Sequence, residues 1–331
     1  GDRMKVAVTG GTGYVSAHSA RALVDAGHDL RFLVHPDDRL DDALPAVGID
    51  TTDHEIVLGD IRSADASERL LTGADALLHA AGIVAVDDRQ EPLMWDINVD
   101  ATARVLARAV TDGLDPILHV ASYITLFPSP DPVIGPDSPT SPGRSAYGRT
   151  KAAADRIARA FQTAGAPVVV TYPASIVGPA AGSHRGISAS GWGPILTAGV
   201  APSFDGGMSM IDVRDVAELH AAIMQPGRGP RRFVCGGEML DFDEIIDVLE
   251  AAAGRPIRRV PLLPGMVRGL GRVSDAVGKV VPMAAGLSFE AAWLMTAATP
   301  TDDSAALELL GRPWRSARDA LAASVDVVGS Q

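Results

Sequence analysis

The feature that most constrains the fold is a short apolar strand that leads through a glycine-rich turn into a helix. Residues 5–16 read Lys-Val-Ala-Val-Thr-Gly-Gly-Thr-Gly-Tyr-Val-Ser. Gly10 permits the tight turn, and Gly13 lets the backbone approach a pyrophosphate, which the N–H groups and dipole at a helix N-terminus attract. Ser16 provides the third small position, and a second apolar strand follows the helix. This context predicts dinucleotide binding rather than an ordinary tight turn.

Short apolar runs alternate with helix-period segments up to residue 175. The expected strands are 5–9, 30–34, 55–58, 76–79, 117–121 and 168–172. The expected helices are 14–26, 64–71, 92–112 and 146–164. The strands are almost continuously apolar, which is typical of a sheet with helices on both faces. The pattern predicts an α/β fold, a doubly wound parallel sheet of the Rossmann type.

The rest of the chain predicts a smaller, mostly helical part. We expect residues 4–178 to form the dinucleotide-binding domain, with its sheet completed by 208–235. Residues 179–207 and 236–329 would then form a substrate-binding part over the mouth of the sheet. Its expected helices are 242–253, 262–281, 288–298 and 316–327.

Two irregular stretches follow strand ends, where open α/β sheets bind ligands. Residues 127–144 contain six prolines, which exclude a helix or a central strand, and residues 178–193 are rich in Gly, Ser and Ala. For both stretches, an ordinary surface loop and a substrate-facing loop remain open.

The charge and cysteine content of the chain indicate which classes of binding partner to expect. The formal net charge is −12, with no basic run, so a nucleic-acid partner is not expected. The most apolar stretch, near residues 280–298, is interrupted by Pro282 and Glu290, so no membrane partner is expected either. One cysteine, Cys235, excludes an internal disulfide and fits a cytoplasmic protein. A small-molecule substrate is expected, and a homodimer is kept open.

The residue at the end of the second strand indicates whether a dinucleotide-binding domain prefers NAD or NADP. An acidic residue there would bind a ribose 2′-hydroxyl, and a basic one would favour a 2′-phosphate. The strand 30–34 is followed by His35, and then by Pro36, Asp37, Asp38 and Arg39. Because position 35 carries no carboxylate, the sequence favours NADP, with NAD as the alternative.

Tyr147 and Lys151 are four residues apart at the start of a predicted helix, so they share one face. A nearby ammonium stabilises a phenolate and lowers the pKa of the phenol, which makes the pair suitable for acid-base catalysis. Both residue types are rare here, with four tyrosines and three lysines in the chain. Ser122, 25 residues earlier, lies at the end of the fifth predicted strand. The alternative to a catalytic role is that Tyr147 and Lys151 are an incidental pair on the helix surface.

Together with further motifs, these residues resemble those of the extended short-chain dehydrogenase/reductases. This family includes nucleotide-sugar epimerases, dihydroflavonol reductases and 3β-hydroxysteroid dehydrogenases, and the resemblance covers nearly the whole chain. Besides the glycine turn and the Tyr-Lys pair, the matching segments are 59–61 (Gly-Asp-Ile), 79–82 (His-Ala-Ala-Gly), 98–99 (Asn-Val), 119–122 (His-Val-Ala-Ser), 172–179 (Tyr-Pro-Ala-Ser-Ile-Val-Gly-Pro) and 211–217 (Ile-Asp-Val-Arg-Asp-Val-Ala).

The resemblance implies a role for each matching residue. Tyr147 would be the general acid-base, Lys151 would lower its pKa and hold the nicotinamide ribose, and Ser122 would bind the reacting oxygen. Asn98, the only asparagine, would support the surroundings of the lysine. The implied cofactor-binding residues are Gly10, Thr12, Gly13, Tyr14, Val15, His35, Arg39, Asp60, Ile61, Ala80, Ala81, Gly82, Lys151, Pro173, Ala174 and Ile176. No metal is expected.

The chain also departs from the family pattern. Ala121 stands where the family usually has the first of two hydroxyl residues, which leaves Thr125 as a second choice for the catalytic hydroxyl. Tyr172 replaces the arginine that commonly precedes Pro173. No acidic pair accompanies Ser122, which argues against a sugar 4,6-dehydratase.

The residues expected near the substrate are mostly apolar: Met94, Trp95, Ile124, Leu126, Phe127, His184, Trp192, Met208 and Met210. Each of these aromatic and methionine residues could equally belong to the core. The only nearby cations for a sugar-nucleotide diphosphate are Arg185, Arg214, Arg231 and Arg232. We therefore expect hydride transfer to or from a carbonyl or secondary alcohol on a small, largely apolar molecule. A sugar-nucleotide epimerase with tightly held NAD and a non-catalytic dinucleotide-sensing protein are the alternatives.

Overall fold

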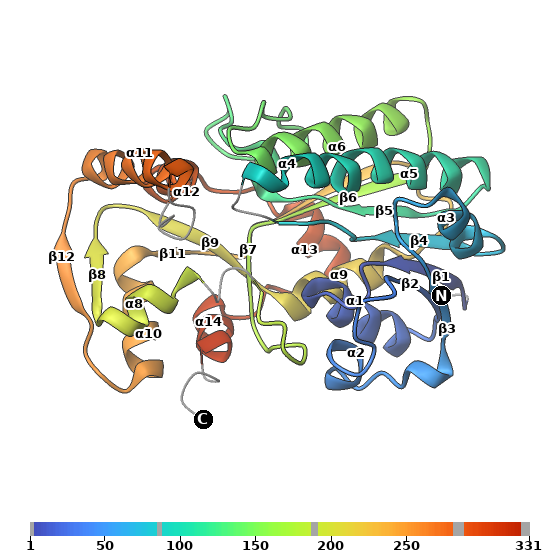
Figure 1. The fold of residues 1–331 in the computed structure, drawn as a ribbon, viewed down its shortest axis with the longest axis horizontal. Helices are drawn as coiled ribbons and strands as arrows, with labels where there is room; N and C mark the ends of the chain where they lie inside the picture. The colour runs from blue at the N-terminus through green and yellow to red at the C-terminus, as the bar shows by residue number, and fades with distance from the viewer. Residues whose placement is uncertain (1–2, 85–87, 187–190, 281–287, 326–331) are drawn as a thin grey trace.

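The computed structural model describes residues 3–84, 88–186, 191–280 and 288–325 (Figure 1). The strands are β1 (Lys5–Thr9), β2 (Asp29–Val34), β3 (Glu55–Leu58), β4 (Ala76–His79), β5 (Ile117–Val120), β6 (Val168–Pro173), β7 (Ser175–Val177), β8 (Val200–Ser203), β9 (Gly207–Asp212), β10 (Arg231–Cys235), β11 (Glu238–Asp241) and β12 (Arg258–Pro261). The helices are α1 (Tyr14–Asp25), α2 (Ala43–Ala46), α3 (Ala64–Leu71), α4 (Glu91–Met94), α5 (Thr102–Thr111), α6 (Ala146–Thr163), α8 (Gly193–Ala198), α9 (Val213–Ile223), α10 (Phe242–Ala253), α11 (Pro264–Val280), α12 (Phe289–Ala297), α13 (Ser304–Leu310) and α14 (Ala317–Val325).

A seven-stranded sheet forms the centre of the molecule, with the strand order β10-β6-β5-β4-β1-β2-β3. Every neighbouring pair in it is parallel. The strand order reverses between β1 and β4, and in open α/β sheets the crevice at the carboxyl ends of such strands binds the ligand. The prediction of a doubly wound parallel sheet is therefore confirmed.

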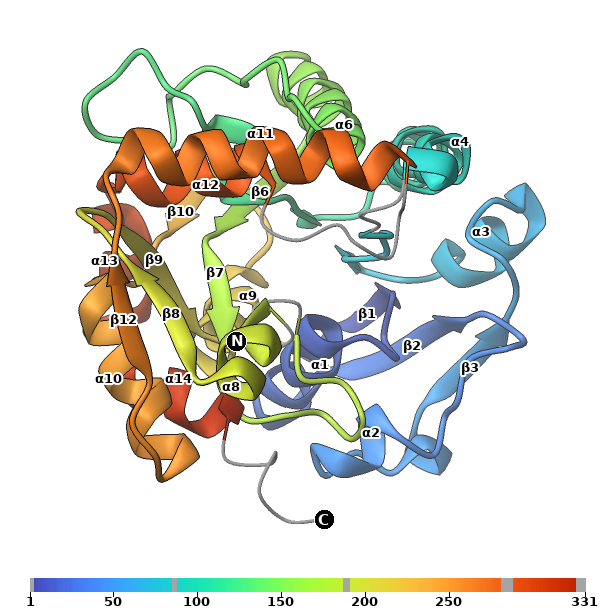
Figure 2. The same ribbon diagram turned by 60° about the vertical axis from the view of Figure 1, so that its left-hand side comes forward.

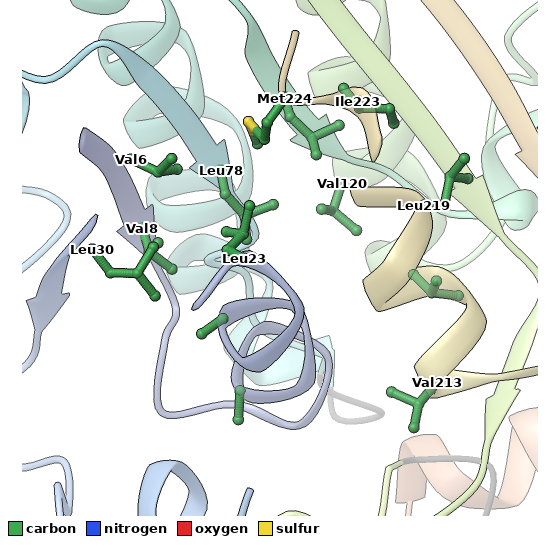
Figure 3. Packing of buried hydrophobic residues seen from close by; sticks show 14 of the residues in the cluster. Val6, Val8, Leu23, Leu30, Leu78, Val120, Val213, Leu219, Ile223 and Met224 are labelled. Atoms are coloured by element: carbon green, nitrogen blue, oxygen red, sulfur yellow. The ribbon is translucent and has the colours of Figure 1, made fainter. Parts of the chain in front are cut away.

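Helices cover both faces of this sheet, as its nearly continuous apolar strands require. On one face α1 and α9 pack together, and Figure 3 shows Leu23 of α1 near Val8 of β1, with Val213 and Leu219 along the neighbouring helix α9. On the other face α3, α5 and α6 cover side chains such as Leu77 and Val170. This packing fixes the glycine turn and the start of α6 at the same end of the sheet.

The C-terminal part lies beyond the carboxyl ends of the central strands (Figures 1 and 2). It contains a three-stranded sheet, β11-β9-β7, and a two-stranded sheet, β12-β8. Helices α8, α10, α11, α12 and α14 surround them, and α10 packs on α14. Strand β10 joins the central sheet, whereas β9, which covers the predicted start of the completing segment, pairs outside it with β7 and β11.

Most predicted elements agree with the observed ones within two residues. The amphipathic helix α10 begins after Asp241, which forms a capping box with Glu244, and it ends at Gly254 with a positive φ of 62°. Helices α11 and α14 are described over Pro264–Val280 and Ala317–Val325. The predicted helices 262–281 and 316–327 end at residues that lie outside the described part of the chain.

One expected helix differs in its internal geometry. The predicted helix 92–112 consists of α4, a π-helical segment at Trp95–Ala101 and α5. Such π-segments in α-helices often occur at functional sites. Here the segment carries Asn98, whose buried side chain contacts the residues after β4. Across the described residues, no helix is long and apolar enough to span a membrane.

Candidate active site

The glycine turn lies at the strand-order reversal and is shaped for close backbone contact. Gly10 has a φ of +69°, and a Cβ atom there would lie 2.9 Å from the backbone nitrogen and Cα of Ala81. No other residue would fit both the conformation and the space. Gly13 precedes α1 without a side-chain cap, so the first N–H groups of the helix are available to an anion. The turn therefore fits the pyrophosphate of a dinucleotide.

Buried hydrogen bonds hold the loop after β4 against this turn. Thr9 Oγ1 accepts hydrogen bonds from the backbone nitrogens of Ala80 and Ala81, each at 3.1 Å. Its hydroxyl is therefore free to donate to His79 Nδ1 at 2.8 Å, which leaves the other ring nitrogen of His79 to donate to Thr102 Oγ1 at 2.9 Å. These hydrogen bonds hold residues 80–82 in place, and the resemblance predicts that these residues contact the ribose and phosphates of the cofactor.

Charged groups gather where the adenosine end of a dinucleotide would lie. Arg62 donates hydrogen bonds to the carboxylate of Asp60, and this pairing lowers the pKa of Asp60 to about 2. His35 Nε2 lies 3.6 Å from the same carboxylate. Asp38 accepts a hydrogen bond from Thr12 Oγ1 at 2.9 Å. Asp38 is one of the two carboxylates after His35 that keep NAD as the alternative cofactor. Arg62 also lines the cavity and was not predicted to do so, although it directly follows the Gly-Asp-Ile motif.

Tyr147 lies in the first turn of α6, beside Ser122 at the end of β5. Ser145 caps this helix by accepting a hydrogen bond from Gly148 N at 2.9 Å, which fixes the direction of the first turn. Burial raises the pKa of Tyr147 to about 12, while a hydrogen bond from Ser122 lowers it and Glu290 raises it. Thr125, the second choice for the catalytic hydroxyl, is buried and donates to Ser122 O.

Lys151 lies one turn after Tyr147 on the same face of α6. Its Nζ atom donates to Val120 O at 3.4 Å. Burial lowers the pKa of Lys151 to about 8, and Asp155 opposes this shift. Below it, His119 is buried, and neither of its ring nitrogens has a hydrogen-bond partner in the described part of the chain. Burial also lowers the pKa of His119 well below its usual value, so the ring beneath the ammonium is neutral.

Asn98 does not line the cavity and instead forms hydrogen bonds with the backbone of Ile83 and with Thr150. Its Oδ1 accepts from Ile83 N at 2.8 Å, and its Nδ2 donates to Ile83 O at 2.9 Å. Nδ2 also contacts Thr150 Oγ1, next to Lys151 in the sequence, at 3.2 Å. Asn98 thus ties the loop after β4 to α6.

A cavity of about 780 Å³ joins these groups. Among the predicted cofactor and catalytic residues, it is lined by Gly10, Thr12, Gly13, Tyr14, Val15, His35, Asp60, Ile61, Ala80, Ala81, Gly82, Ser122, Tyr147, Lys151, Pro173, Ala174 and Ile176. Asn98 lies behind the wall. Arg39 does not line the cavity, because its exposed guanidinium pairs with Asp41.

The predicted substrate residues are less well placed. Only Ile124 and Met208 line the cavity. Met94, Leu126, Phe127, Trp192 and Met210 are buried in the packed cores, so the core alternative holds for them. Trp95 is half-exposed and donates to Glu91, and His184 lies near Asp42. The prediction missed several apolar wall residues that come from distant segments: Leu93, Ile97, Met239, Leu294 and Ala298.

The four arginines that were the only candidates for binding a diphosphate do not line this cavity. Arg214 pairs with Asp212, and Arg232 pairs with Asp137. Arg231 and Arg232 line a separate surface depression, and Arg185 lines neither. Within the described residues, the positively chargeable side chains of the main cavity are His35, Arg62 and Lys151. Apart from the predicted cofactor and catalytic residues, the described lining of this cavity is mostly apolar, with the hydroxyl residues Ser209 and Thr299 among it.

The chain is similar in sequence to a family model and to known proteins, and similar in structure to solved proteins. Residues 6–236 match the model of the NAD dependent epimerase/dehydratase family. A sterol demethylase protein B of Methylococcus capsulatus is 26% identical over 82% of this chain and 81% of its own. A putative dihydroflavonol 4-reductase of Synechocystis is 26% identical over 96% of this chain and 92% of its own.

The fold comparison extends over the whole molecule. The crystal structure of UDP-glucose 4-epimerase from Bifidobacterium longum, in complex with NAD+ and UDP, superimposes with a TM-score of 0.74. The two chains are 20% identical, and the match covers 97% of each. The family match spans more than half of the sequence and includes the glycine turn, Ser122, Tyr147 and Lys151. The chain belongs to the NAD-dependent epimerase/dehydratase family, a group of extended short-chain dehydrogenase/reductase enzymes.

Proposed function

We propose that the protein transfers a hydride between a nicotinamide cofactor and a carbonyl or secondary alcohol of a small, largely apolar substrate. When bound, the nicotinamide would supply or accept the hydride. In the direction of reduction, the hydroxyl of Tyr147 donates its proton to the substrate oxygen, and Ser122 orients that oxygen by a hydrogen bond. Lys151 lies beneath the tyrosine and stabilises the resulting phenolate.

The observation that carries the proposal is the mostly apolar lining that the cavity has besides the predicted cofactor and catalytic residues. It includes Leu93, Ile97, Ile124, Met208 and Leu294, and Arg62 is the one arginine among the described lining residues. A diphosphate against this apolar lining would need cationic or bidentate donors, since an unpaired buried charge is strongly unfavourable. An apolar carbonyl compound has no such need, and its burial against this lining would contribute about 25 cal/mol per Å².

A substrate screen tests the proposal. Purified protein is mixed with NADPH or NADH and with aldehydes, ketones, steroid ketones or sugar-nucleotide ketones, and the absorbance of the reduced cofactor is followed. We expect consumption with apolar ketones and none with sugar nucleotides. Turnover restricted to sugar nucleotides, without net consumption of the cofactor, would favour the epimerase alternative.

For the cofactor we propose NADP, with the 2′-phosphate between His35 and Arg62. Both side chains line the cavity, and position 35 carries no carboxylate. Replacing His35 by Asp places a negative charge there, so the Kd for NADP should rise about tenfold or more, while the Kd for NAD should not rise, because a carboxylate at this position can bind the ribose 2′-hydroxyl. Fluorescence titration with both cofactors measures this shift.

Arg39 offers a matched control for this titration. The sequence also predicted it as a cofactor contact, but its side chain pairs with Asp41 outside the cavity. We therefore expect Arg39→Gln to leave the Kd for NADP within about twofold, well under 1 kcal/mol. A wild-type protein that binds NAD more tightly than NADP would contradict the proposed preference.

A further inference from the structure

Exposed apolar side chains gather on the outer edge of the C-terminal part. Of the eleven large apolar side chains that are exposed in the described chain, six lie here: Val200, Val260, Leu263, Met266, Leu270 and Val273. Leu263 is 70% exposed and Val273 is 60% exposed. Soluble surfaces rarely cluster such residues without a partner. We call these six residues the apolar edge.

The apolar edge is continuous from β12 into α11. Val200 of β8 lies opposite Arg258 in the parallel pair of β8 and β12, and β12 leads directly to Leu263 and α11. Along α11, Met266, Leu270 and Val273 recur at spacings of four and three residues, so they share one face. Figure 1 shows β12 and α11 at one margin of the molecule, and in Figure 2 α11 crosses in front of α12.

The apolar edge is distinct from the face with which α11 packs on the protein. Val267 is buried, and a Cβ atom on Gly271 would lie 2.8 Å from the backbone of Phe289 in α12. Arg272 lies over the ring of Phe289 with its guanidinium carbon 4.7 Å from the ring centre. The helix is therefore anchored to α12 by one face and leaves Met266, Leu270 and Val273 facing outward.

The charge of this segment is opposite to that of the whole chain. Residues 255–280 contain six basic residues and one acidic residue, Asp275, in a protein whose formal net charge is −12. Arg258 and Arg268 are exposed, and neither forms an ion pair within the described residues. Arg259 contacts three carboxylates of α10, Asp243, Asp247 and Glu250, so it adds no free cation and the excess negative charge lies on the α10 side. The free cations therefore flank the apolar edge.

We propose that the apolar edge and its flanking arginines dock the protein on the surface of an anionic lipid bilayer. An interfacial helix combines an outward apolar face with basic side chains that contact lipid headgroups, and it does not cross the membrane. This differs from the sequence expectation, which considered a spanning segment and predicted no membrane partner. Because α12 packs on α11 and also supplies Leu294 to the cavity, the docking surface and the apolar lining of the cavity share one helical pair.

Charge favours this occupant over a second copy of the chain. A symmetric contact between two such edges would bring Arg258 and Arg268 of both copies together without neutralising them. Anionic headgroups would neutralise them. The inference is independent of which substrate the cavity takes, since it concerns only the outer face of α11 and β12.

Vesicle co-sedimentation tests the proposal with the full chain. We expect binding to vesicles of equal parts phosphatidylglycerol and phosphatidylcholine, weaker binding to phosphatidylcholine alone, and strong weakening at about 1 M salt, where the Debye length falls to about 3 Å. The double variant Leu263→Ser/Leu270→Ser should bind at least tenfold more weakly. Arg258→Glu/Arg268→Glu should lose more than about 25-fold, since each cation contributes about fivefold.

Matched controls lie outside the edge. Leu58→Ser replaces a 56% exposed leucine on β3, and Arg228→Glu replaces an exposed arginine, so both variants should bind vesicles like the wild type. Circular dichroism verifies that every variant folds. Absence of wild-type binding, or equal losses in the edge and control variants, overturns the proposal. It is also overturned if light scattering shows a dimer that Leu263→Ser/Leu270→Ser dissociates while no vesicle binding occurs.

Discussion

Replacing Tyr147 by Phe should abolish turnover and leave cofactor binding almost unchanged. The variant keeps the ring and loses only the hydroxyl that contacts Ser122. Because this hydroxyl is the proposed proton donor, kcat/KM should fall by about 10³-fold or more, at the upper end of the range for general acid-base catalysis. The Kd of the cofactor should stay within about threefold, since the phosphate-binding turn and Lys151 are untouched.

Tyr123→Phe provides the matched control. It removes the same atom from the wall of the same cavity, but the hydroxyl of Tyr123 donates to Thr299 O at 3.1 Å and, within the described part of the chain, forms no hydrogen bond with Ser122. We expect this variant to retain at least a third of the wild-type kcat/KM, a loss of well under 1 kcal/mol. Equal losses in both variants would show that the cavity wall matters and that Tyr147 has no special role. Wild-type turnover in Tyr147→Phe would refute the mechanism.

The repeated units of the fold could be predicted because each carries its own local signal. The expected helices 64–71 and 242–253 coincide with α3 and α10, because Ser63 and Asp241 cap them and their apolar faces are clear. The sheet follows from parallel apolar strands. By contrast, the small sheet of β7, β9 and β11 joins segments far apart in the chain, and no local pattern specifies such pairing.

The same distinction explains the site. Gly10, Ser122, Tyr147 and Lys151 belong to short motifs with fixed spacing, so their proximity could be inferred from the sequence. The apolar lining of the cavity has no motif, because Leu93, Met239 and Leu294 come together only when the C-terminal part packs on the central sheet. Composition alone could not separate these residues from Met94 or Trp192, which are equally apolar and lie in the cores. Arg39 pairs with Asp41 outside the cavity, so its predicted contact with the cofactor stays a prediction.

Replacing Lys151 by Met should strongly lower kcat/KM and should increase the free energy of unfolding of the cofactor-free protein. Burial lowers the pKa of Lys151 to about 8 from a usual value of 10.5, which means that the folded chain disfavours the ammonium. Methionine has a similar shape and no charge, so the free energy of unfolding at pH 7 should increase by about 1 kcal/mol. Loss of the positive charge beside Tyr147 should lower kcat/KM by about 10²- to 10³-fold.

The dependence of stability on pH separates this explanation from a general packing effect. Between pH 8 and 10.5 the unfolded chain holds a proton on Lys151 that the folded chain has lost, so this residue makes wild-type stability rise with pH in that interval. Methionine does not titrate. The stability advantage of Lys151→Met should therefore be constant below pH 8 and shrink towards pH 10.5 in chemical denaturation series. An advantage that stays constant up to pH 10.5 would exclude a buried ammonium as its cause, and would leave side-chain packing to explain it.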